Sequence, residues 1–186
     1  MTQEIRTYVD GCDSCQRMNN RRHKPYGLLQ PLPMPKGPWK DIAMDFITDL
    51  PPSLFRGKAY DSILVVADRY SKMVVFIPCN KTMEATDLAE AMESNVFKHY
   101  GIFESCVTDR GSLFTSGWWS TFCHYWNIRR RLSTAFHPQT DGMTERQNQT
   151  LEIFLRSYVN YHQDDWARLL AAAEYRLNDN VNVTTG

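Results

Sequence analysis

Uninterrupted apolar runs, rich in valine and isoleucine, recur along the middle of this chain. Runs of this length without alternating polar positions are typical of strands that are buried on both faces of a sheet. Two such runs, Ile63–Ala67 and Met73–Ile77, are predicted to be strands, and Asp41–Leu50, Glu104–Thr108 and Asn127–Ser133 are predicted to be three more. Such a sheet must be covered by helices on both faces.

Apolar residues at helical spacing predict the covering helices. The first spans Thr82–Tyr100, with Thr86 as its polar start and Gly101 ending it as a C-terminal cap. Ser116 and Gly117 precede a second helix over Trp118–Trp126. The predicted order of three strands, helix, strand, helix and strand favours an α/β fold with a mixed sheet.

The last third of the chain predicts a loop and two more helices. Turn-forming residues in Phe136–Gly142 predict a mobile loop, and Met143–His162 has the pattern of a long amphipathic helix. Its apolar stripe is Leu151, Phe154, Leu155 and Tyr158, and its polar face carries Glu145, Asn148, Gln149 and Glu152. Asp164 or Asp165 would cap a final helix whose apolar positions are Trp166, Leu169, Leu170, Ala173 and Leu177.

The first 38 residues differ from the rest. A short helix is predicted at Gln3–Val9, and Cys12 and Cys15 have the spacing of half a zinc site. Five prolines and two glycines in 24–38 preclude a regular helix or a central strand, so this segment is a linker. We therefore expect three parts: 1–23, the linker 24–38, and a globular core at 39–186.

Composition narrows the class of protein only a little. Of 186 residues, 42% are hydrophobic, enough for a sizeable core, and no apolar run is long enough to span a bilayer. The five scattered cysteines argue against a disulfide framework, so we expect an intracellular protein without membrane partners. Net charge is zero, but residues 1–40 hold seven Lys and Arg against three Asp and Glu. This basic segment could follow a phosphate backbone or serve as a solvated linker.

Three acids stand out as candidate metal ligands. Asp45 interrupts an apolar stretch, where a charge is costly unless it is paired. Asp109 lies in V-T-D-R-G-S, and Glu145 lies in H-P-Q-T-D-G-M-T-E-R, with thirty-five residues between them. Asp49, Asp61 and Asp68 also lie near strand ends and are the acids most easily mistaken for members of this set. Each of the three candidates alone could equally be a strand-edge, turn or surface acid.

The D-F-I, T-D-R-G-S and H-P-Q-T-D-G-x-T-E-R motifs occur in order, at a spacing that resembles the integrases of long-terminal-repeat retrotransposons (Ty3/gypsy-like) and retroviruses. The resemblance implies a ribonuclease H-like fold over 39–186, a segment of a retroelement polyprotein, and Asp45, Asp109 and Glu145 as catalytic residues. It also implies that 1–23 is the tail of a His-His-Cys-Cys zinc module without its histidines, so we expect no bound zinc. The small C-terminal domain of a full integrase is expected to be missing.

The chemistry implied is metal-dependent polynucleotidyl transfer, with 3′-end processing and strand transfer of retroelement DNA into target DNA. Two Mg²⁺ or Mn²⁺ ions per active site, held by the three carboxylates once DNA is bound, would neutralise the phosphate and activate the attacking oxygen. The candidate DNA-binding residues are Arg110, His137, Gln139, Asp141, Arg146, Asn148 and Gln149. Met143 and Leu113 occupy positions that are usually polar in the family. Both are expected to touch loops rather than the metal ligands, so the three acids are unaffected.

Expected partners are element and target DNA, a second copy of the chain in a dimer or higher multimer, and a host targeting factor, with the nucleus as the place of action after a cytoplasmic particle. Two alternatives remain: a domesticated, catalytically silent DNA-binding module, and a ribonuclease H-like nuclease.

Arg129, Arg130 and Arg131 alternate across the fifth strand, so at least one must face the covered side or the sheet edge. They could contact phosphate, or they could protect an edge strand from aggregation. Cys79, Cys106 and Cys123 are expected to be buried.

Overall fold

The computed structural model of the protein describes residues 2–12, 34–132 and 138–179, with the side chains of the last range described from residue 146 onward. The chain divides into two compact units, Met1–Pro31 and Leu32–Gly186. In the first unit, helix α1 (Thr2–Gly11) includes the helix predicted at Gln3–Val9. Cys15 and linker residues 24–33 lie outside the described ranges, and residues 34–38 form neither helix nor strand.

A mixed sheet forms the centre of the second unit. Its strands within the described ranges are β1 (Asp41–Ile47), β4 (Ser62–Asp68), β5 (Val74–Cys79), β6 (Ser105–Thr108) and β7 (Arg129–Leu132), in the order β5-β4-β1-β6-β7. The strand pairs β1–β4 and β4–β5 are antiparallel, whereas β1–β6 and β6–β7 are parallel. The prediction of a five-stranded mixed sheet is therefore confirmed for the part of the chain that is described.

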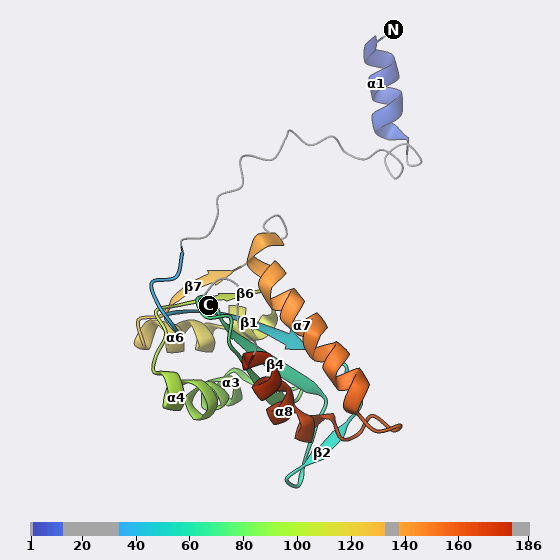
Figure 1. Ribbon diagram of the computed structural model, residues 1–186. Coiled ribbons are helices and arrows are strands. Elements are labelled where there is room, and N and C mark those ends of the chain that lie inside the picture. The colour runs from blue at the N-terminus through green and yellow to red at the C-terminus, as the bar shows by residue number, and fades with distance from the viewer. Residues whose placement is uncertain (1, 13–33, 133–137, 180–186) are drawn as a thin grey trace. The chain divides into compact units, whose positions relative to one another are not determined.

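Helices cover both faces of this sheet, as the buried strands require (Figure 1). On one face, Leu64 and Val66 of β4 pack with α3 (Ala85–Met92) and α6 (Gly117–Tyr125). On the other face, Val65 and Ala67 pack with residues of α7 (Pro138–Tyr158) and α8 (Trp166–Asn178). All seven residues of β4 are buried, because this strand is covered from both sides.

Several boundaries differ from the predictions for local reasons. The first covering helix begins at Ala85 after the N-cap Glu84, and it widens into a π-helix at Glu93–Phe97 before α4 (Lys98–Tyr100). Two short elements were not predicted: a hairpin of β2 (Ser53–Phe55) and β3 (Lys58–Tyr60), and helix α5 (Ser112–Thr115). Elements of three or four residues are too short to leave a periodic signal.

The predicted loop at Phe136–Gly142 is wrong over residues 138–142, because α7 begins at Pro138. Proline at the first helical position loses no hydrogen bond and supplies a suitable φ angle, so the residue taken as a turn former instead starts the helix. The helix ends at Tyr158, four residues before the predicted end. Leu151 and Leu155 are buried as predicted, whereas Tyr158 is 64% exposed and lies outside the core.

Side chains of α8 cover the free edge of the sheet at β5. Asn178 accepts a hydrogen bond from Val74 N and donates one to Val74 O, both at 2.8 Å, and Glu174 Oε2 accepts one from Phe76 N at 3.0 Å. These contacts satisfy backbone groups that would otherwise offer an edge for another strand. Burial raises the pKa of the Glu174 carboxyl, opposed by the hydrogen bond from Phe76 and by nearby His99.

Candidate active site

The pairing of β1 with β6 brings two of the predicted acids together. In this parallel pair Met44 lies opposite Thr108, so the next residues, Asp45 and Asp109, follow at the same level of two adjacent strands. Adjacent strands lie about 4.8 Å apart, which is close enough for two carboxylates to share a cation. Asp45 is fixed within the strand, while Asp109 is the first residue after β6 ends.

Asp45 and Asp109 line one open pocket with a volume of about 270 Å³. The pocket also contains Lys81 and residues from the turn that follows Asp109. Gly111 N donates a hydrogen bond to Asp109 Oδ1 at 2.9 Å, which orients that carboxylate. A Cβ atom at position 111 would lie 3.0 Å from the same oxygen, so the glycine in T-D-R-G makes room for the acid.

Helix α7 reaches the pocket through Asn148. Its Nδ2 atom donates a 2.8 Å hydrogen bond to Asp45 Oδ2, while Phe46 N donates to Asp45 Oδ1 at 2.9 Å. Both oxygens of Asp45 therefore receive a fixed donor. The polar face predicted for this helix therefore includes a residue that contacts Asp45.

Glu145 belongs to α7 and lies three residues before Asn148, nearly one helical turn away. Its side chain is outside the described set. Among the side chains that the structure does describe, no three Asp, Glu, His or Cys residues gather as a metal-binding group. The carboxylate pair at Asp45 and Asp109 nevertheless suits a hard divalent cation, since Mg²⁺ takes oxygen ligands and retains waters in its shell.

The three acids judged easy to mistake for ligands are engaged elsewhere. Asp68 is fully buried and accepts hydrogen bonds from Tyr70 N, Ser71 N and Ser71 Oγ. Asp61 accepts hydrogen bonds from Ser62 Oγ and Lys81 N. Asp49 forms an exposed 2.6 Å ion pair with Lys81, and this hydrogen bond is the main reason that the pKa of Asp49 is lowered.

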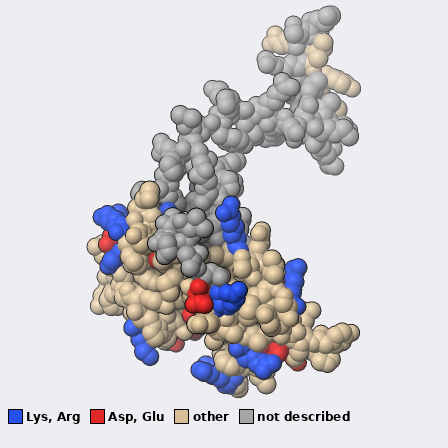
Figure 2. All heavy atoms as spheres, in the orientation of Figure 1, with Lys and Arg blue, Asp and Glu red and all other residues tan. Residues whose placement is uncertain are grey.

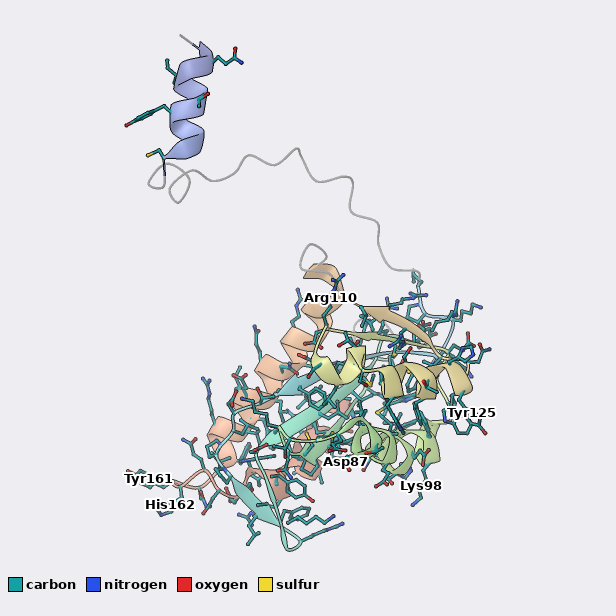
Figure 3. The ribbon with its side chains drawn as sticks, turned by 180° about the vertical axis from the view of Figure 1, so that it is seen from behind. Asp87, Lys98, Arg110, Tyr125, Tyr161 and His162 are labelled. Carbon is teal, nitrogen blue, oxygen red and sulfur yellow. The ribbon has the colours of Figure 1, made fainter. Side chains whose placement is uncertain are left out.

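The candidate DNA-binding residues fall into two groups. Arg110, Arg146 and Gln149 are exposed or partly exposed, and Figure 3 shows Arg110 at the end of the core unit where α7 begins. Gln139 and Asp141 belong to the first turns of α7, with side chains outside the described set, and His137 lies outside the described ranges altogether. Their role in DNA binding stays a prediction.

Residues that the sequence did not single out complete the site. The backbone of Gly111 and the side chains of Lys81 and Asn80 border the pocket. The glycine was visible as part of T-D-R-G-S, whereas no sequence signal linked Lys81 to Asp109.

None of the three core cysteines lines this pocket. Cys79, Cys106 and Cys123 are buried, as predicted. Burial raises the pKa of the Cys79 thiol to about 12, so this group stays protonated at neutral pH.

Comparison with known sequences agrees with this geometry. The sequence profile described as "Integrase core domain" matches residues 38–138. The chain is 37% identical over 182 residues to the Transposon Tf2-3 and Tf2-4 polyproteins of Schizosaccharomyces pombe, which covers 98% of this chain and 13% of each polyprotein. The chain therefore spans about one eighth of the length of these relatives.

Solved structures share the fold at low sequence identity. A chain of the simian T-cell lymphotropic virus intasome in complex with PP2A regulatory subunit B56 gamma matches with a TM-score of 0.64 and 20% identity, covering 100% of this chain and 64% of that one. The HTLV-2 integrase catalytic core domain in complex with magnesium matches with a TM-score of 0.59 and 21% identity, covering 87% and 95%. The predicted ribonuclease H-like fold is confirmed, and the chain belongs to the integrase core domain family of retrotransposons and retroviruses.

Proposed function

We propose that this chain is the catalytic core of a retrotransposon integrase, which processes the 3′ ends of element DNA and joins them to phosphates of target DNA. One observation carries the proposal. Asp45 in β1 and Asp109 directly after the parallel strand β6 lie side by side and line the same pocket. A chain released from catalysis has no physical need for two carboxylates held side by side, because like charges at this distance repel each other.

Asp45, Asp109 and Glu145 would hold two divalent cations, Mg²⁺ or Mn²⁺. When bound, such ions neutralise charge on the reacting phosphate and lower the pKa of the attacking water or hydroxyl. The HTLV-2 integrase core, which has the same fold, was solved in complex with magnesium.

The protein's own contribution is to fix these ligands. Asp45 is rigid because it lies within β1 and receives donors from Phe46 N and Asn148 Nδ2. Asp109 is held by Gly111 N at the end of β6. Glu145 lies on α7, the helix that carries Asn148, so the position of this helix would set both the third ligand and one of the donors to Asp45.

The remaining partners belong to the same proposal. DNA would lie across the pocket, with Arg110, Arg146 and Gln149 among its contacts. A second copy of the chain would be needed because two element ends must be joined in a coordinated way. A host factor that directs the complex, and action in the nucleus, are consistent with this proposal.

The test is a joining assay with the 186-residue chain, duplex DNA with a recessed 3′ end, and Mg²⁺ or Mn²⁺. Joined product that forms with metal and disappears with a chelator is the expected result. DNA binding without joining or cleavage would favour the silent DNA-binding module instead. Cleavage of RNA–DNA hybrids without joining would favour the ribonuclease H-like nuclease.

A further inference from the structure

A group of basic side chains lies on the α7-facing side of the sheet, apart from the two aspartates. Arg69 and Lys72 belong to the turn after β4, and Arg131 belongs to the edge strand β7. All three are partly buried. The other described Lys and Arg side chains that are visible in Figure 2 are spread over the surface.

Strand register places these residues relative to the acids. Ala67, Ala43, Val107 and Arg131 form one row across β4, β1, β6 and β7. Asp45 lies two residues further along β1 than Ala43, so Arg131 lies one row, about 7 Å along the strands, from the level of Asp45 and Asp109. Arg69 N donates a hydrogen bond to Asp41 O, which places Arg69 one row beyond Ala43 and Ala67, on the side away from Asp45.

The floor between the two arginines is small and apolar. Ala43 and Ala67 are almost completely buried, and Ala67 belongs to the core cluster formed with α7 and α8. Arg130, the neighbour of Arg131, points to the opposite face, where it donates to Phe114 O and Ser120 Oγ. Arg131 is therefore committed to the α7-facing side.

Neither guanidinium is fully satisfied. Nη1 of Arg69 and Nη1 of Arg131 are buried and have no hydrogen-bond partner in the part of the chain that the structure describes. Burial lowers the pKa of Arg69, Asp41 raises it, and Arg131 lowers it, so the two guanidinium groups repel each other. A buried donor without an acceptor is costly, and an anion between two cations would remove both penalties.

The two described acids that act on Arg69 already accept other hydrogen bonds. Asp68 uses its oxygens to accept hydrogen bonds within the turn 68–71, and Asp41 accepts one from Ser105 Oγ. The turn is rigid as a result, and it is tied to α7 because Gln147 Nε2 donates to Lys72 O at 2.8 Å. The next residue of α7, Asn148, is the one that contacts Asp45.

We propose that Arg69 and Arg131, with Lys72 beside them, form a binding site for a backbone phosphate of DNA, one or two nucleotides from the reacting phosphate. This inference rests on the proposed function, since it assigns a further contact to the same DNA. The offset of about 7 Å between Arg131 and the level of the two aspartates is of the order of the separation between neighbouring phosphates of one DNA strand. The site positions the strand and reads no base, because phosphate contacts carry no sequence information.

The test is DNA binding by the 186-residue chain in a chelator, so that no chemistry takes place. Fluorescence anisotropy with a labelled duplex is measured at several salt concentrations for the parent, Arg131→Gln and Arg69→Gln. Loss of a charge-assisted hydrogen bond predicts roughly tenfold weaker binding for each variant. The slope of log affinity against log salt should fall by about 0.9, the value for one phosphate.

Arg168→Gln is the matched control. It also replaces an arginine by glutamine, but this arginine forms an ion pair with Asp165 at the start of α8. The DNA affinity of this control should stay within about twofold of the parent. Melting temperature separates a binding role from a structural one: removing one of two repelling cations should leave it unchanged or raise it.

Unchanged affinity and salt slope in both variants would overturn the inference, as would a parent chain that does not bind DNA. A lower melting temperature with unchanged affinity would show that the arginines serve the fold. If inorganic phosphate stabilises the parent but not Arg131→Gln, while both bind DNA equally, the site takes free phosphate rather than DNA. Failure of the joining assay together with weaker DNA binding by the variants would refute the proposed enzyme and leave this site standing.

Discussion

Asn148→Ala separates the role of α7 in the site from its role in the fold. The substitution removes the 2.8 Å hydrogen bond that Nδ2 donates to Asp45 Oδ2. A hydrogen bond to a charged group contributes about 1.5–3 kcal/mol. Considered alone, this loss would predict a clear drop in stability.

The same substitution also removes a penalty. Asn148 Oδ1 is buried without a hydrogen-bond partner among the described residues. Burial of an unsatisfied acceptor costs about 1–3 kcal/mol, close to the value of the lost bond. The two effects largely cancel, so we expect the free energy of unfolding to change by less than about 1.5 kcal/mol.

Activity should respond much more strongly. Without Asn148, Asp45 Oδ2 loses this donor while Oδ1 keeps the one from Phe46 N, so the carboxylate can turn. Loss of a partner that orients a metal ligand typically reduces metal affinity or activity by about 10–100-fold. The concentration of Mg²⁺ that gives half-maximal joining should therefore rise by about that factor.

The assay is a Mg²⁺ titration of joining, paired with chemical denaturation of the same preparations. Ser157→Ala is the control, since it removes an exposed hydroxyl from the same helix. Wild-type metal dependence in the Asn148 variant would refute the positioning role. A stability loss of several kcal/mol with normal metal dependence would show that Asn148 serves the fold instead.

Two further predictions concern stability and assembly. Glu174→Gln keeps an acceptor for Phe76 N but removes a carboxyl whose pKa burial raises. Because this pKa is raised in the folded state, the stability of the parent is greatest at a pH below the pKa of the unfolded chain, and it falls as pH rises through the pKa of the folded chain. In melting curves taken from about pH 4 to pH 7, the melting temperature of the variant should therefore rise relative to that of the parent toward pH 7. A steady loss relative to the parent over that range would contradict this. The core should also self-associate through the outer faces of the helical regions 82–100 and 118–126, where Trp118 and Tyr125 are 44% and 79% exposed. Trp118→Glu should shift sedimentation toward the 21.7 kDa monomer, and a parent that is monomeric at high concentration would refute the prediction.

The sequence predicted the sheet well because its central strands are buried on both faces. Every residue of β4 is inaccessible or nearly so, and a continuous apolar run of this length between polar turns is typical of such a strand. The boundaries of α7 failed because Pro138 and Gly142 were taken as turn residues, while the helix tolerates both. Tyr158 has the spacing of a core residue but lies in the last turn of the helix, where its ring contacts Phe154 at the surface.

The site was predictable in its residues but not in its contacts. The motifs identified Asp45 and Asp109, yet their level placement depends on a parallel pairing of strands about sixty residues apart. Asn148 lies on the polar side of a helix, and sequence alone does not distinguish a polar side facing water from one facing an acid. At least one of the three arginines of the fifth strand was expected to lie on a covered side or at the sheet edge, and β7 is an edge strand. The unsatisfied Nη1 of Arg131 depends on the packing around it and leaves no trace in the sequence.

The central claim is tested most directly by joining activity in Asp109→Asn, with Asp49→Asn as the control acid. The amide keeps the shape of Asp109 but removes the charge that would bind cations, so joining and cleavage should be abolished. Without metal its melting temperature should hold or rise, and added Mg²⁺ should stabilise the parent more than the variant. Asp49 is exposed and pairs with Lys81, so its amide variant should join DNA nearly as well as the parent. Retained joining by Asp109→Asn, or lost joining by a folded Asp49→Asn, would contradict the assignment of the catalytic acids.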